Sequence, residues 1–149
     1  MSYVVDANVA IKWAVKEALH EEARHVLGLS YSLTAPDLIS AEICNVLRRK
    51  VQLGEIGREQ GREVIWFVHW VVRDPYPSRA LAEPAYEMAL RLGHPAYDCF
   101  YLAYAQLIRA PLITADAKFA QKAAAGGFAD HVIDLALIRE APDSAATLG

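Results

Sequence analysis

Residues 3–9 read YVVDANV, a short apolar run that ends in an acid. We expect a first strand over residues 3–5, because runs of β-branched and aromatic residues favour strands. A helix is expected to follow from about residue 9 to residue 16. Asp6 then lies between a strand and a helix, where either Asp6 or Asn8 can cap the helix N-terminus. Since a helix needs one such cap, one of these two polar side chains is free for another role.

The same pattern returns late in the chain, where residues 112–119 read LITADAKF. A strand over residues 112–114 is expected to lead through Asp116 into a helix over residues 118–125, which two glycines end. Asp116 is therefore either an N-cap or a functional acid. Thr114 precedes it by two residues, and its hydroxyl can order a water or a carboxylate, or satisfy local backbone groups.

Strands and helices alternate along the rest of the chain. The further expected helices cover residues 21–27, 36–53, 58–73, 79–92 and 95–109, and the further strands cover residues 32–35 and 131–133; residues 64–68 taken alone could equally be strand. This order predicts an α/β fold, a small parallel sheet with helices on both faces. Ligands of such sheets bind beyond the carboxyl ends of the strands, which is where Asp6 and Asp116 are expected.

Two further acids lie on expected helices. Glu42 shares a polar stripe with Asn45 and Arg49, so it is either an ordinary solvated side chain or a functional one. Asp37, beside Pro36, is expected to cap that helix. Asp98 is the sharpest signal, because its helix is apolar around nearly its whole circumference. A carboxylate buried there carries a desolvation cost of several kcal/mol unless a metal ion or a cationic partner offsets it.

Four acids drawn from distant parts of the chain suggest a single cation site. Carboxylates brought close together raise each other's pKa, which makes an all-acid cluster unfavourable without a positive charge. Oxygen ligands favour hard divalent ions, so Mg²⁺ or Mn²⁺ is the expected cofactor. We expect Asp6, Asp98 and Asp116 to be the main ligands, and Glu42 to be either a ligand or the group that positions a water.

The bulk properties fit one compact domain over residues 1–149, with 54% hydrophobic residues and a net charge of −3. The negative charge argues against a passive nucleic-acid binder, although a bound cation would let an acidic protein act on phosphodiesters. The N-terminus has no basic segment before an apolar run, so no signal peptide and a cytoplasmic location are expected. Cys44 and Cys99 are expected to be buried free thiols. Loose segments are expected at residues 74–78 and 142–149.

Three other features have weaker functional claims. Residues 48–50 and the pair Lys118 and Lys122 are basic and could contact phosphate, but a solvated face is the simpler interpretation. The aromatic stretch over residues 66–70 is expected to be core, in part a dimer or partner surface. None of the five histidines has a metal-pair spacing such as HExxH.

Taken in order, four segments resemble the PIN-domain nucleases, and most closely the VapC-type toxins of bacterial toxin–antitoxin pairs. The matching segments are residues 4–8 (VVDAN), 35–47 (APDLISAEICNVL), 97–103 (YDCFYLA) and 112–119 (LITADAKF). Each segment is weak alone, but the four in this order are quite specific. Only residues 53–92 lack a recognisable motif.

The resemblance implies a three-layer α/β/α sandwich with a metal site built from Asp6, Glu42, Asp98 and Asp116. It also implies that Asn8 and Thr114 are polar supports of that site, although many relatives have a hydroxyl residue in place of Asn8. The implied activity is metal-dependent cleavage of RNA. A cognate antitoxin and a homodimer are the implied partners, and no membrane is involved.

Three alternatives compete with this hypothesis. A phosphohydrolase with an aspartate nucleophile after the first strand usually has a second acid two residues on, where this chain has Asn8. A receiver-like signalling domain needs a phosphoacceptor aspartate at the end of a central strand and a lysine after the last strand, and the sequence offers neither. An inactive binding module is the third, but all four acids are present.

Overall fold

The computed structural model describes residues 1–29 and 31–139, and its centre is a four-stranded parallel sheet. The strands are β1 (Ser2–Val5), β2 (Ser32–Thr34), β3 (Leu112–Thr114) and β4 (Val132–Asp134), in the order β2-β1-β3-β4. Val5 pairs with Ile113, so the residues that follow these two, Asp6 and Thr114, lie side by side. The expected α/β class and parallel sheet are confirmed.

The order of the strands places a topological switch between β1 and β3. The chain moves from β1 to β2 in one direction along the sheet, and from β2 through β3 to β4 in the other. Helices that leave neighbouring strands at such a switch point diverge, which opens a crevice beyond the carboxyl ends of those strands. Asp6 and Asp116 follow β1 and β3, so both lie at this crevice.

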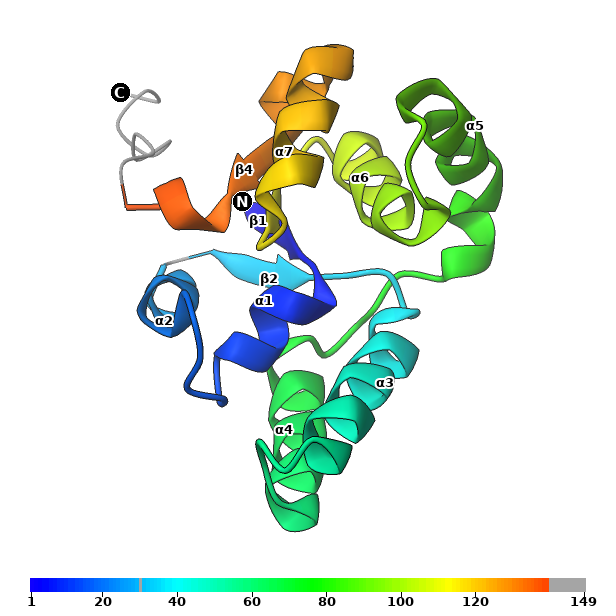
Figure 1. Ribbon diagram of the computed structural model, residues 1–149. Coiled ribbons are helices and arrows are strands. Elements are labelled where there is room, and N and C mark those ends of the chain that lie inside the picture. The colour runs from blue at the N-terminus through cyan, green and yellow to red at the C-terminus, as the bar shows by residue number, and fades with distance from the viewer. Residues whose placement is uncertain (30, 140–149) are drawn as a thin grey trace.

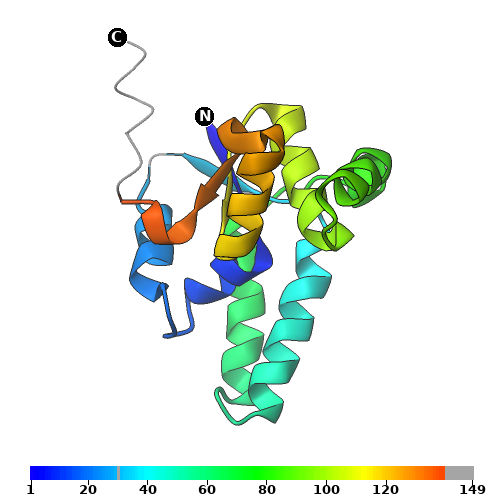
Figure 2. The ribbon, with the colours of Figure 1, turned by 45° about the horizontal axis from the view of Figure 1, so that its top comes forward.

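The described residues include seven α-helices, and Figure 1 shows α1 and α2 on one side of the sheet and α6 and α7 on the other. Their bounds are α1 (Ala7–Lys12), α2 (His20–Leu27), α3 (Ile39–Gln52), α4 (Arg58–Val71), α5 (Ala82–Leu92), α6 (Ala96–Ile108) and α7 (Ala117–Ala123). Short helical turns cover Ser78–Leu81, Ala124–Phe128, Ala129–His131 and Leu135–Leu137. In Figures 1 and 2, α3 and α4 lie side by side and extend away from the sheet.

Helix α6 is the central helix of the core, as its apolar sequence predicts. Residues 101–105 are all buried, and the helix contacts β1, β3 and α5. Trp13, Tyr101 and Phe119 are among the largest fully buried side chains. The first turn of α6 emerges from this packing at the crevice, which is why Asp98 can reach the carboxyl ends of the strands.

Several element boundaries differ from the sequence-based expectation. Helix α1 ends at Lys12 and not near residue 16, because the Nδ1 atom of His20 contacts the carbonyl oxygens of Lys12 and Val15, 2.6 and 3.1 Å away. The expected cap Asp37 does not cap α3. Its Oδ1 accepts a hydrogen bond from the backbone N–H of Ser78 at 3.0 Å.

Three side chains lie elsewhere than expected. Cys44 is an exposed free thiol, whereas Cys99 is buried as predicted. Trp66 and Trp70 of α4 are 69% and 63% exposed, so they do not belong to the core. The segment over residues 142–149 lies outside the described residues. Over the described ranges, none of the helices is long and apolar enough to cross a membrane.

Candidate active site

Asp6 combines the two roles that its sequence position allowed. Its Oδ1 caps α1 by accepting a hydrogen bond from the Val9 N–H at 2.8 Å, while its Oδ2 accepts one from the Thr114 hydroxyl at 2.6 Å. The side chain is buried, and burial raises its pKa to about 6 against the opposing effect of these hydrogen bonds. Asp6 is therefore a fixed carboxylate, held at the switch point with its charge only partly compensated.

Thr114 joins the ends of β1 and β3. Its side chain is 1% exposed; the hydroxyl donates to Asp6 and accepts a hydrogen bond from the Asp116 N–H at 3.1 Å. Asp116 in turn caps α7, with Oδ1 accepting from the Phe119 N–H at 3.0 Å. One oxygen of Asp116 is thus committed to the helix, and the other is available at the crevice.

Glu42 approaches the same crevice from the first turn of α3. Its Oε1 is buried without a hydrogen-bond partner among the described residues, and so is the hydroxyl of Tyr101. Burial is the main cause that raises the Glu42 pKa to about 7, followed by the charges of Asp98 and Asp6. Asn45 and Arg49 are exposed, as expected for a solvated face of α3, whereas Glu42 is partly buried.

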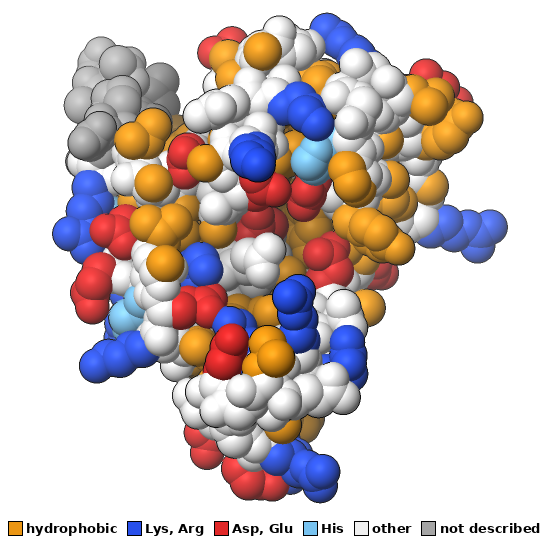
Figure 3. All heavy atoms as spheres, viewed as in Figure 1, with side chains coloured by type: hydrophobic (Ala, Val, Ile, Leu, Met, Phe, Trp, Pro, Cys, Tyr) orange, Lys and Arg blue, Asp and Glu red, His pale blue; other side chains and the backbone are white. Residues whose placement is uncertain are grey.

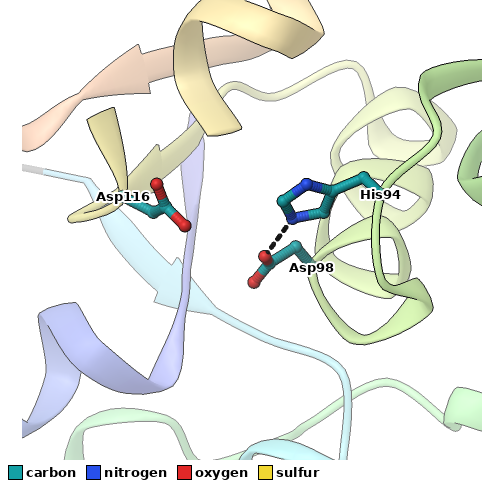
Figure 4. A group of neighbouring side chains, drawn as sticks. All are labelled: His94, Asp98 and Asp116. Carbon is teal, nitrogen blue, oxygen red and sulfur yellow. Dashed lines mark hydrogen bonds and ion pairs between the residues drawn. The ribbon is translucent and has the colours of Figure 1, made fainter. Parts of the chain in front are cut away.

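Asp98 completes the group from the first turn of α6. Its Oδ2 lies 2.6 Å from Nε2 of His94, and its side chain is 30% exposed, so it is less buried than the helix pattern suggested. Ligand atoms of Asp98, Asp116 and His94 all lie within 4.8 Å of one another. Figure 4 shows the three side chains facing one another across the space between α6 and the end of β3.

The four acids predicted from the sequence therefore lie around the same crevice, although only Asp98 and Asp116 of them share the group with ligand atoms within 4.8 Å of one another. The charge of Asp98 raises the pKa of both Asp6 and Glu42, and Asp116 lies beside Asp98. Figure 3 shows acidic side chains gathered in the hollow at the middle of this face, with lysine or arginine side chains on both sides. Asn8, in contrast, is exposed in the first turn of α1, and no contact described in residues 1–29 or 31–139 joins its side chain to the acids.

Two residues of this neighbourhood were missed by the sequence analysis. His94 has none of the usual metal-pair spacings of histidines, but it precedes Asp98 by four residues across the start of a helix. This spacing is a usable signal for a contact between the two side chains. Tyr101 follows Asp98 by three residues and so lies on the same face of α6. Its pKa is raised by burial and then by the charges of Glu42 and Asp6, which places its hydroxyl against the acids.

The donor set fits a hard divalent cation. Four carboxylates supply oxygen ligands, and the partnerless Glu42 Oε1 and Tyr101 hydroxyl are the kind of buried polar atoms that an ion or an ordered water satisfies. A cation would also lower the raised pKa values of Asp6 and Glu42. Fold and site together define an α/β protein with a group of carboxylates, able to hold a divalent cation, at the switch point of its sheet.

Comparison with known proteins identifies the family. The PIN domain family matches residues 3–125. Ribonuclease VapC1 of Mycobacterium tuberculosis is 37% identical over 87 residues, which is 58% of this chain and 64% of that protein. VapC ribonuclease Mb0985 of Mycobacterium bovis is 30% identical over 115 residues, which is 77% of this chain and 86% of that protein. The chain thus spans just under two thirds of the first of these relatives.

A solved structure shares the fold. The crystal structure of PAE2754 from Pyrobaculum aerophilum superposes with a TM-score of 0.66 at 22% sequence identity, covering 94% of this chain and 97% of that one. The chain belongs to the PIN domain family. This membership favours the nuclease hypothesis over the aspartyl phosphohydrolase and receiver-like alternatives.

Proposed function

We propose that this protein is a divalent-metal-dependent endoribonuclease and the toxin of a type II toxin–antitoxin pair. We further propose that residues 1–149 form one PIN-like domain and that Asp6, Glu42, Asp98 and Asp116 are its active site. The similarity to proteins named VapC ribonucleases supports the substrate class and the toxin role.

One observation carries the proposal. Asp98 and Asp116 have ligand atoms within 4.8 Å of each other, and Asp6 and Glu42 lie near enough to Asp98 for its charge to raise their pKa values. Asp6 and Asp116 follow β1 and β3, at the edge where a parallel sheet of this order binds its ligands. Two of the four acids, Asp6 and Glu42, have pKa values raised by burial and by their neighbours. Glu17, in contrast, is a part-buried acid with a structural role, and it is paired with Lys12 and Lys50.

In this scheme Asp6, Asp98 and Asp116 hold Mg²⁺ or Mn²⁺, and Glu42 either joins them or orients the attacking water. Thr114 fixes the orientation of Asp6. Asn8 would be a polar support toward the substrate, because its exposed side chain has no described contact with the acids. When bound, the metal lowers the pKa of a water and neutralises developing charge on the phosphate. Water would attack the phosphorus directly and one P–O bond to a ribose oxygen would break, releasing that oxygen as a hydroxyl, so no covalent protein intermediate would form.

Several side chains are arranged to receive the substrate. Lys122 is exposed, as a solvated face predicts, and its Nζ lies 3.4 Å from the ring of His94, so it is near enough to the acids to contact a phosphate as well. A lysine ammonium binds phosphate as a point charge. We expect the RNA backbone to pass between the basic side chains that flank the acidic hollow (Figure 3).

The experiment that tests this function is cleavage of structured RNA in the presence of Mg²⁺ or Mn²⁺. Wild-type protein is expected to cleave, and EDTA or the substitution Asp98→Asn to abolish cleavage. Asp134→Asn is the matched control, because Asp134 also ends a strand but caps a short helical turn through Ala136 instead of facing the acids. Full activity in EDTA, or in the Asp98→Asn variant, would disprove the proposed mechanism.

We also propose two protein partners, a cognate antitoxin and a second copy of this chain. The exposed Trp66 and Trp70 of α4 support a partner surface, since a large exposed aromatic pair is unusual on a free monomer. Light scattering of the purified protein, alone and with the product of an adjacent small gene, tests both. A monomer that binds no such product would contradict this part of the proposal.

A further inference from the structure

His94 occupies the corner between α5 and α6 and is aimed at Asp98. Gly93 ends α5 with a φ of 59°, a left-handed conformation that glycine adopts without strain, and the His94 N–H then donates to the Ala89 carbonyl at 3.1 Å. From this corner Nε2 reaches Oδ2 of Asp98 at 2.6 Å (Figure 4). The backbone thus directs the ring to the site.

The contacts of the ring place a hydrogen on Nε2. This atom lies 2.6 Å from Oδ2 of Asp98, and an ionised carboxylate only accepts hydrogen bonds, so Nε2 donates to Asp98. The other nitrogen, Nδ1, faces Nζ of Lys122 at 3.4 Å. The ring also packs on Phe119 with centroids 4.6 Å apart, and Phe119 and Lys122 both belong to α7. The imidazole is thus held on two sides by the helix that follows Asp116.

We infer that His94 is a positioning residue for Asp98. It binds one oxygen of that carboxylate from outside and leaves the other to face the cation shared with Asp116. This inference rests on the proposed metal-dependent function. A direct metal ligand is the alternative, but Nε2 is already engaged by Asp98 and Nδ1 faces the Lys122 ammonium. Neither nitrogen is free to bind a cation while these contacts persist.

The physical consequence is an effect on metal affinity. A carboxylate ligand that is itself hydrogen-bonded is orientated before the metal arrives, and loss of such an outer contact typically weakens binding ~10- to 100-fold. Lys122 supports the same series of contacts from the other side of the ring, where its Nζ faces Nδ1. Its loss should weaken binding less than the loss of the ring, because the ring can still donate to Asp98.

The test measures Mn²⁺ binding by electron paramagnetic resonance, together with urea unfolding of the metal-free protein. His94→Leu removes the donor and keeps comparable bulk, and it should weaken Mn²⁺ binding ~10- to 100-fold. His94→Gln places an amide N–H near the position of Nε2 and should restore most of the affinity. His25→Leu is the control, since His25 is exposed on α2, a helix that contributes none of the four acids, and the change should leave binding unchanged.

The outcomes separate the roles. The inference is overturned if His94→Leu binds Mn²⁺ as tightly as the wild type, or if His94→Gln does not restore the affinity that His94→Leu loses. The proposed metal site itself stands in either case, provided that the wild-type protein binds Mn²⁺. A ¹⁴N coupling to Mn²⁺ in pulsed spectra of the wild type, absent from His94→Leu, also overturns the inference, because His94 is then a ligand. Wild-type protein that binds no Mn²⁺ removes the proposed metal site and this inference with it.

Discussion

The hydroxyl of Thr114 donates to Oδ2 of Asp6 across the junction of two parallel strands, with the two oxygens 2.6 Å apart. The same hydroxyl accepts from the backbone of Asp116, so one buried side chain ties together two of the four acids. This contact exists because Val5 and Ile113 are paired in the sheet, which brings the following residues together. The geometry of the site is therefore a consequence of strand register.

Removing that hydroxyl should destabilise the protein. Thr114→Val keeps the shape of the side chain but leaves a buried oxygen of Asp6 and the Asp116 N–H without their partner, at a cost of ~1–3 kcal/mol. Thr114→Ser keeps the hydroxyl and should lose much less. Urea unfolding of the three proteins measures the difference. Equal stability of the Val and Ser variants would show that the hydroxyl does not hold Asp6.

Metal binding should stabilise the folded state through Asp6. A cation that binds only the native protein adds about 2.7 kcal/mol when present at 100 times its dissociation constant. The Tm of the wild type should therefore rise with Mn²⁺, and that of Asp6→Asn should not, although asparagine can still cap α1. Thermal unfolding with and without Mn²⁺ measures this. An equal rise in both proteins would place the cation elsewhere.

The metal-free protein should lose stability as the pH rises from about 4 to about 7. The folded-state pKa of Asp6 is about 6 and that of Glu42 about 7, above their ordinary values of 3.8 and 4.5. Both carboxyl groups therefore bind a proton more tightly in the folded protein than in the unfolded one. The stabilisation that results is complete at a pH below the ordinary pKa values, and it is lost as the pH rises through the raised, folded-state pKa values. The slope is at most ~1.4 kcal/mol per pH unit for each proton.

Urea unfolding at a series of pH values in EDTA tests this slope. Asp6→Asn removes one of the two titrating groups and should flatten the curve, while Asp134→Asn should leave it unchanged. Saturating Mn²⁺ should also flatten it, because the bound cation favours the charged carboxylates. A wild-type curve that rises over this range would contradict the assigned burial of these acids.

Tyr101→Phe should leave the metal-free protein at least as stable as the wild type. The Tyr101 hydroxyl is buried and lies close enough to Glu42 to lower the pKa of that acid, but the geometry of the two groups falls short of a hydrogen bond. An unsatisfied buried polar group costs ~1–3 kcal/mol. Its removal relieves that cost without changing the packing of the ring. Urea unfolding in EDTA measures the effect. A clear loss of stability would show that the hydroxyl donates to Glu42 in solution.

Much of this fold was predictable because its signals are local. Strand β3 has the predicted bounds, and the acids at the ends of β1 and β3 follow from the rule for parallel sheets. Glu42 was harder to place. Its polar stripe on α3 also contains the exposed Asn45 and Arg49, so helical periodicity alone does not predict that Glu42 faces the other acids.

The position of α3 depends on a distant contact. Pro36 forms a parallel bridge with Tyr76, and the Asp37 N–H donates to the Tyr76 carbonyl at 2.7 Å. This bridge fixes the start of α3 beside the crevice, and no local pattern announces a pairing across 40 residues. The contact of Asp37 with Ser78 belongs to the same junction, which is why the expected cap failed. His94 is the opposite case, since a spacing of four residues is local but common.

Diffraction from crystals soaked in Mn²⁺ tests the central claim most directly. The account predicts an anomalous peak in the crevice at the ends of β1 and β3, at bonding distance from oxygens of Asp6, Asp98 and Asp116. A peak elsewhere on the protein, or none at a concentration that supports RNA cleavage, would contradict it.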